Sequence, residues 1–202
     1  MAVQPARDIA RGCRLQAACT PLSSPESTSH TGSMREVAGW LEQTPRILRL
    51  MLRASGEAEY LWKPSPSRWS IAEVLGHLCH VEKLGFRRRV ERIMNEDNPL
   101  LENYDPNAFA AAGAYSGRTL EDALTEFERE RAESLELLRT LPVDAAARPG
   151  RHAELGPLTL GHLIHEWPFH DLGHVRQIAE LLRAAKYYPH MGPWQKFYTI
   201  NP

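Results

Sequence analysis

Two histidines, His170 and His174, stand four residues apart in a segment with the apolar periodicity of a helix. In an α-helix this spacing places both side chains on one face, one turn apart, so that two imidazoles can share one metal ion. Helical HxxxH pairs of this kind occur in many zinc sites. The pair alone is a weak motif, because a helical histidine can equally be a hydrogen-bonded core residue and two ligands hold a metal poorly.

A third ligand must come from elsewhere in the chain, and a second apolar segment provides candidates. His77 and His80 lie in a stretch whose apolar residues recur at steps of three and four. Helical bundles build metal sites from side chains on facing helices. The residue types therefore leave two alternatives open: a divalent-metal site shared by two helices, or histidines that are hydrogen-bonded in the core.

Glu166 stands one turn before His170 and is the candidate catalytic residue. Its carboxylate has three conceivable roles: a fourth metal ligand, a general base, or an acceptor for an imidazole N–H. A carboxylate hydrogen-bonded at the bend that Pro168 introduces explains it equally well. Gln177, three residues beyond His174, is expected either to line the same pocket or to pack between helices.

The remaining polar side chains near these motifs are given ordinary roles. Asp171 and Glu82 are expected to face solvent or to hydrogen-bond the metal ligands. His152 and His190 fall in predicted loops, where a solvated side chain is expected. Structural or surface positions are expected for His162 and His165. The arginine run Arg87–Arg89 is expected to face solvent, as charge runs on helices usually do.

Four amphipathic helices are predicted to position these residues, over residues 34–54, 70–95, 119–141 and 159–185. The second begins at a capping box formed by Ser70 and Glu73. Pro45 is expected to kink the first helix or to mark a restart. The connection over residues 98–117 is too long for a hairpin turn, and strand signals are scarce. The pattern predicts an all-α fold, a four-helix bundle with a long crossover connection.

Length and composition place the protein in an ordinary globular class. The chain of 202 residues is 43% hydrophobic and 24% charged, which suits one domain with a sizeable core. Its formal net charge of −1 gives no electrostatic reason for binding nucleic acid or an anionic membrane. No apolar stretch is long enough to span a bilayer, and no signal peptide is recognised. We therefore expect a soluble, cytoplasmic protein.

Two regions are expected along the chain. Residues 1–33 carry little apolar periodicity and include a stretch rich in serine, threonine and proline, which is typical of a disordered extension. A transit peptide or an upstream mistaken start codon would also explain this extension, since Met34 opens the first periodic segment. Residues 34–202 form the predicted bundle domain.

Two blocks of the chain resemble motifs of the DinB/YfiT-like metalloenzyme superfamily. WSIAEVLGHLCHVE (residues 69–82) is similar to the WSxxEVxxHLxDxE block of that family, and HDLGHVRQI (residues 170–178) is similar to its HxxxHxxQI block. The resemblance implies a four-helix bundle that binds one divalent metal ion through three histidines, which are His77, His170 and His174. The family often has aspartate where this chain has His80, so His80 stays an alternative ligand or a hydrogen-bonding neighbour.

The resemblance also implies a chemistry. Three neutral imidazoles and an open position suit zinc, nickel or iron as the divalent ion. Related proteins imply a metal-activated low-molecular-weight thiol that attacks a small electrophilic substrate. A metal-dependent hydrolase and a non-catalytic metal-binding or interaction bundle are the alternatives. The expected partner is a small molecule, without nucleic acid or membrane, and a homodimer that pairs through one bundle face is compatible with the pattern.

Overall fold

A computed structural model describes residues 30–103 and 105–202 of the chain. Its helices are α1 (His30–Leu52), α2 (Glu57–Leu61), α3 (Ile71–His80), α4 (Arg88–Asn95), α5 (Pro106–Ala111), α6 (Leu120–Thr140) and α7 (Leu160–Leu182). Its strands are β1 (Leu100–Leu101), β2 (Pro149–His152) and β3 (Gly156–Thr159). The predicted disordered extension falls mostly on residues 1–29, which lie outside the described part.

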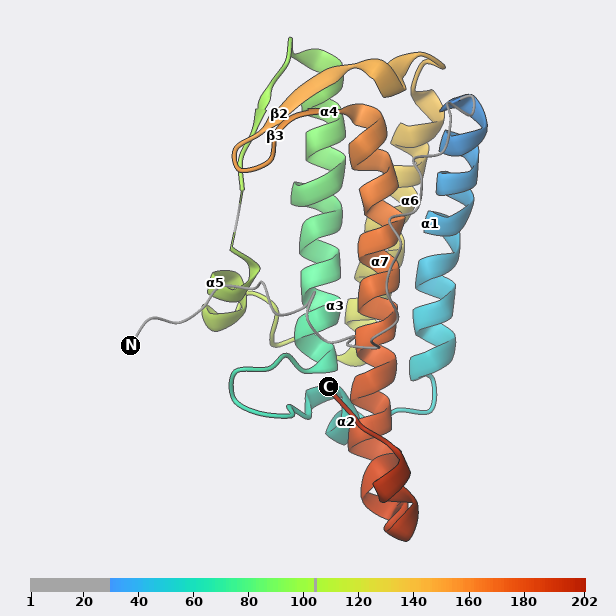
Figure 1. Cartoon of the computed structure of the whole chain (residues 1–202), viewed down its shortest axis with the longest axis vertical. Coiled ribbons are helices and arrows are strands. Elements are labelled where there is room, and N and C mark those ends of the chain that lie inside the picture. Colours follow the sequence, from blue (N-terminus) through green and yellow to red (C-terminus); the bar gives the residue numbers. More distant parts are fainter. Residues whose placement is uncertain (1–29, 104) are drawn as a thin grey trace.

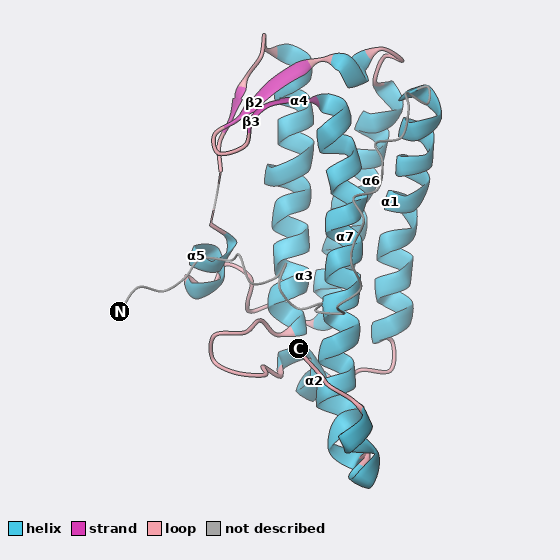
Figure 2. Cartoon of the chain, viewed as in Figure 1, coloured by secondary structure: helices cyan, strands magenta, loops and turns pink. Residues whose placement is uncertain are grey.

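Four long helical segments run side by side in a bundle: α1, the joined α3 and α4, α6, and α7 (Figures 1 and 2). Both α1 and α3 pack against α6 and against α7. The end of α4 and the start of α6 lie at opposite ends of the bundle, and the chain returns along the outside through β1 and α5 (Figure 1). The structure confirms the predicted four-helix bundle with a long crossover connection.

Local capping signals set the starts of three of these helices. Ser70 Oγ accepts a hydrogen bond from the Glu73 amide, and the Glu73 carboxylate accepts one from the Ser70 amide (2.8 Å). Thr119 and Thr159 cap α6 and α7 in the same way through their hydroxyl groups. These starts are where the sequence predicts them, because a cap satisfies backbone N–H groups that the first turn leaves unpaired.

The first helix differs from the prediction at two points. It begins at His30, four residues before Met34, so the last residues of the expected extension belong to its backbone. It also continues through Pro45 without a restart. Its apolar side chains pack against α6 and α7, and this packing keeps one helix despite the backbone hydrogen bond that proline cannot make.

The second long helix contains a π-helical segment, Val81–Arg87, between α3 and α4. Two charged residues of this segment, Glu82 and Arg87, are buried. The prediction that Arg87 faces solvent is therefore wrong. Its guanidinium donates to the carboxylate of Glu130 (2.5 Å) and to the Glu130 backbone carbonyl (2.8 Å), and this pairing makes its burial tolerable.

The predicted loops contain elements that the sequence did not signal. α2, α5 and a three-stranded sheet lie in them, with β1 parallel and β3 antiparallel to β2. His152 on β2 is buried rather than solvated, and its Nδ1 accepts hydrogen bonds from the amides of Glu154 and Leu155. Strands of two to four residues are too short to show alternation, which is why they escaped prediction.

Two apolar clusters fill the bundle, one toward each end. One contains Leu48, Leu75, Leu78, Phe127 and Ile178, and the other contains Leu41, Phe86, Val90, Ile93 and Trp167. Buried polar residues stand between the two clusters along α3, α6 and α7, and they form a polar layer across the bundle. Among the described residues, none of the helices combines the length and apolar character that a membrane span needs.

Candidate metal centre

His77 on α3 and His170 and His174 on α7 bring their rings together between the two helices. Nε2 of His170 lies 3.2 Å from Nε2 of His77 and 3.2 Å from Nε2 of His174. Within the described residues, these three make up the group of histidine, cysteine or acidic side chains close enough to share an ion, with ligand atoms within 4.8 Å of one another. We call them the histidine group.

The nitrogen separations fit one shared ion. Metal–nitrogen bonds of about 2.0–2.1 Å at angles between octahedral and tetrahedral separate two ligand nitrogens by about 2.8–3.4 Å. The two observed separations of 3.2 Å fall in that range. His77 is buried and the other two rings are partly exposed, so the group lies at the edge of the core.

A hydrogen bond to Gln177 fixes which nitrogen of His174 faces the centre. Gln177 Oε1 lies 2.9 Å from His174 Nδ1, and since an amide oxygen only accepts, that nitrogen carries the proton. His174 Nε2 then keeps its lone pair for a metal. The sequence left Gln177 either lining the pocket or packing between helices, whereas here it orients a ring. His170 Nδ1 lies 4.0 Å from Asp171 Oδ1, so a carboxylate stands behind this ring as well.

Behind the histidine group, a buried guanidinium joins two buried carboxylates. Arg131 on α6 pairs with both oxygens of Glu82 (2.8 Å each) and with Asp171 Oδ2 (2.7 Å). It also donates to the Leu41 carbonyl on α1 (2.7 Å), and Trp167 Nε1 donates to Glu82 (3.0 Å). We call Arg131, Glu82 and Asp171 the ion cluster; it connects all four long helices.

The ion cluster rules out one of the two positions expected for Glu82 and Asp171. Neither carboxylate faces solvent, since each is 1% exposed. Burial opposes the charge of Asp171, but Arg131 outweighs it and holds the pKa of Asp171 below its usual range. Glu82 accepts hydrogen bonds from three N–H groups through its two oxygens. Two carboxylates against one guanidinium leave one negative charge, which favours a cation at the adjacent histidine group.

Two of the three histidines, His77 and His174, are held in the neutral form that binds metals. Burial, together with the neighbouring imidazoles, lowers the pKa of His77 to about 2. Burial and His170 lower the pKa of His174 to about 4. Both rings are therefore neutral at neutral pH and need lose no proton before they bind a divalent ion.

Comparison with known proteins places the chain in a family. Residues 40–178 match the DinB superfamily. The chain belongs to this superfamily. It is 23% identical over 143 residues to the Oceanobacillus iheyensis protein named "Putative metal-dependent hydrolase OB0782". The matched region covers 71% of this chain and 82% of that protein.

A solved structure supports the fold of this DinB-superfamily chain. YfiT from Bacillus subtilis, described as "a probable metal-dependent hydrolase with an unusual four-helix bundle topology", matches with a TM-score of 0.71 at 20% identity. The match covers 81% of this chain and 93% of YfiT. At this level of identity, the likeness establishes the shared bundle.

Aromatic side chains that sequence reasoning missed form a wall beside the histidine group. Trp69 lies nearly parallel to the ring of His174, with centroids 6.5 Å apart, and Tyr115 lies 5.8 Å from the ring of His77. Tyr115 approaches α3 at Gly76, where any Cβ would lie 2.7 Å from Tyr115 Cα. Burial raises the pKa of Tyr115 to about 12. Trp69 could have been noticed as the first residue of its motif, whereas no periodicity marks Tyr115.

Two predicted site residues lie outside the histidine group. His80 turns its ring toward Phe109 (4.5 Å) and Tyr115 (5.8 Å), so α3 contributes His77 rather than His80 to the group. Glu166 is exposed on α7, and its carboxylate is close enough to His152 to oppose the lowering of that residue's pKa by burial. The catalytic role of Glu166 stays a prediction.

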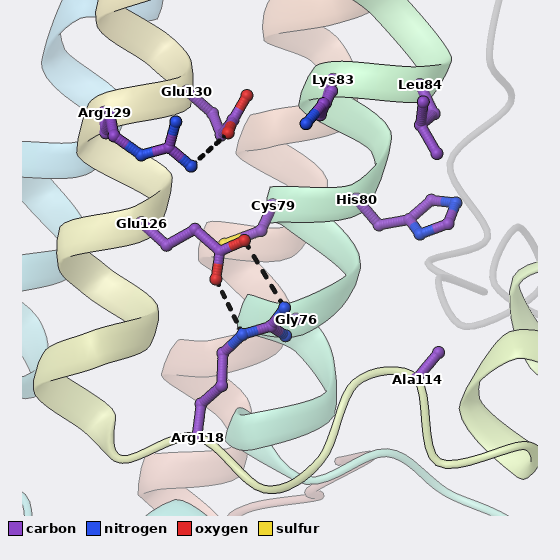
Figure 3. Close-up of a pocket in the computed structure, with 10 residues that line it drawn as sticks. All are labelled: Gly76, Cys79, His80, Lys83, Leu84, Ala114, Arg118, Glu126, Arg129 and Glu130. Carbon is purple, nitrogen blue, oxygen red and sulfur yellow. Dashed lines mark hydrogen bonds and ion pairs between the residues drawn. The ribbon is translucent and has the colours of Figure 1, made fainter.

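A separate cavity of about 170 Å³ lies between α3 and α6 (Figure 3). Its charged walls are already paired in part, since Arg118 binds Glu126 (2.7 Å) and Arg129 binds Glu130 (2.5 Å). His80 also lines it, and none of its lining comes from α7. The cavity is therefore distinct from the histidine group.

Proposed function

We propose that this DinB-superfamily chain is a divalent-metal-dependent enzyme that acts on a small molecule, with the ion held by His77, His170 and His174. One observation carries the proposal: three Nε2 atoms converge, and the described residues offer no fourth histidine, cysteine or carboxylate in the group. Structural zinc sites are closed by a fourth protein ligand, whereas catalytic sites keep an open position.

The chain's own residues prepare the site. A bound divalent ion would supply a Lewis acid that lowers the pKa of a thiol or of water. Gln177 holds the ring of His174, and Asp171 stands behind the ring of His170. Trp69 lies nearly parallel to the ring of His174 and gives the site an apolar wall on that side. The net negative charge of the ion cluster offsets part of the ion's charge, which favours its retention.

For the nucleophile we propose a low-molecular-weight thiol, transferred through its sulfur to a small electrophile. This choice rests on the family resemblance of the two motif blocks. Hydrolysis, with water as the nucleophile, is the second candidate, because the Oceanobacillus iheyensis relative and YfiT are both described as metal-dependent hydrolases. Zinc, nickel and iron all suit three imidazoles.

Elemental analysis of the purified protein and an assay with a chromogenic electrophile test this proposal. Turnover that needs both metal and added thiol supports S-transfer, and turnover that needs metal alone supports hydrolysis. Bound metal without either activity, across a panel of electrophiles, indicates a non-catalytic bundle and contradicts the enzyme proposal. The matched control is His170→Ala, in which activity and metal should be lost together.

Cobalt-substituted protein titrated with a small thiol tests the open position directly. A sulfur-to-metal charge-transfer band is expected. No spectral change in the native chain, with a band created by Glu166→Ala, would show that Glu166 closes the metal shell.

A further inference from the structure

Tyr115 carries a buried hydroxyl that has no hydrogen-bond partner among the described residues. Its side chain is 1% exposed. Burying an unpaired hydroxyl costs free energy, and phenylalanine would fill nearly the same volume without that cost. A polar atom retained at such a cost is a candidate for a functional role.

The surroundings of Tyr115 place it beside the histidine group. Its ring meets those of His77 and Trp69 edge-on, each at 5.8 Å between centroids. Trp69 in turn stacks over His174. Tyr115 therefore belongs to the wall of the same site and not to a remote part of the core.

The backbone around Tyr115 is built to bring it there. The loop that carries it lies directly against Gly76, one residue before His77, where a side chain would collide with the backbone of Tyr115. Gly113 and Gly117 on either side have positive φ angles of 75° and 82°, which glycine adopts without strain. The crossover connection thus delivers one phenol group to a site otherwise made by α3 and α7.

We propose that the Tyr115 hydroxyl donates a hydrogen bond to the small ligand that occupies the open position of the histidine group. The inference rests on the proposed function. It narrows the ligand class to molecules that carry an acceptor oxygen or nitrogen beside the atom that binds the metal, such as carbonyl compounds and small anions. It also assigns to the protein a hydrogen-bond donor, which the three ligating nitrogens cannot be.

Azide binding to cobalt-loaded protein, followed by visible absorption, tests the inference with Tyr115→Phe. We expect azide to bind about tenfold more weakly, the loss of one hydrogen bond to a charged ligand. Cobalt stoichiometry should stay unchanged, and the thermal midpoint of the metal-free protein should stay equal or rise.

Tyr60→Phe is the matched control. Tyr60 is also buried, but its hydroxyl donates to the Thr119 carbonyl (3.5 Å) and it packs in the apolar cluster that contains Leu75. This variant should bind azide like the native chain, and its thermal midpoint should not rise.

Three results would overturn the inference. Native azide affinity in Tyr115→Phe would show that the hydroxyl does not contact the ligand. Cobalt loss or a lower thermal midpoint in this variant alone would show that the hydroxyl holds the metal or the fold instead. A native chain that binds no cobalt would refute the proposed function itself, and the Tyr115 inference would fall with it.

Discussion

The histidine group and the ion cluster lie in the same polar layer and satisfy their polar atoms in opposite ways. In the ion cluster, Arg131 donates to Glu82 and to a backbone carbonyl and forms an ion pair with Asp171, so its charges are paired within the protein. In the histidine group, ring nitrogens of three residues from two helices converge on one another, and no charged side chain is among them. The first arrangement holds helices together, whereas the second matches the ligand set of the metal site proposed above.

The comparison predicts that Arg131→Leu has the largest effect on stability. Without the guanidinium, the carboxylates of Glu82 and Asp171 stay buried and unpaired. The free energy of unfolding should fall by about 3–5 kcal/mol. Urea denaturation measures this, and Arg139→Leu on the same helix is the control, since Arg139 forms an exposed pair with Glu136 and should change stability by less than about 0.5 kcal/mol. Equal effects of the two substitutions would refute the role given to the ion cluster.

His170→Ala should have the reverse effect, with a large loss of metal affinity and a small change in stability. Removing a central ligand should weaken metal binding by more than about 100-fold, beyond the loss of an outer hydrogen bond. The metal-free protein should keep most of its stability, because the substitution relieves crowding among the three imidazoles and leaves the ion cluster intact. Isothermal titration with zinc measures the first effect, and denaturation with chelator present measures the second. Full metal occupancy in a variant lacking His77, His170 and His174 would place the site elsewhere.

Acidification should lower the stability of the metal-free protein through the histidine group. The pKa of His77 is about 2 in the folded chain against about 6.5 when unfolded, so below pH 6.5 the unfolded state binds a proton that the folded state does not. His77 therefore stabilises the fold above pH 6.5, and this contribution is lost as pH falls. Between pH 6.5 and 5 the loss is roughly 2 kcal/mol, at about 1.4 kcal/mol per pH unit.

Denaturation of the metal-free protein at several pH values checks this prediction. The free energy of unfolding of His77→Leu should fall less steeply with decreasing pH than that of the native chain. The difference in slope should be about 1.4 kcal/mol per pH unit, the contribution of one proton. His174 should also contribute to the loss of stability at low pH, because its pKa is lowered as well. An identical pH dependence in the two proteins would contradict the neutral, buried state of His77.

The bundle and the pair His170 and His174 could be predicted because their signals are local, whereas His77 was assigned through the family resemblance. Caps such as Ser70 and Thr159 mark helix starts within a few residues, and the spacing of His170 and His174 needs only the helical repeat. The ion cluster could not be predicted, because burial of Glu82 depends on Arg131, which lies far along the chain on another helix.

Tyr115 escaped prediction for the same reason. It lies in a crossover loop without periodicity, and its position beside the histidine group depends on the contact of its backbone with Gly76 of α3. Polarity alone made exposure the expectation for Arg87 and one of two alternatives for Asp171, and both are buried because each has a charged partner on α6. Tertiary pairing, absent from any local pattern, decides such positions.

The smallest predicted effect concerns the hydrogen bond behind the histidine group. Gln177→Leu removes the acceptor that holds His174 in the tautomer with a free Nε2 lone pair, so metal affinity should fall about tenfold. Competition with a chromophoric chelator measures it. Glu166→Gln is the control, because Glu166 is exposed and stands outside the group, and it should leave affinity unchanged. Weaker binding in Glu166→Gln than in Gln177→Leu would make the carboxylate a metal ligand. Unchanged affinity with lower turnover would instead support the general-base role.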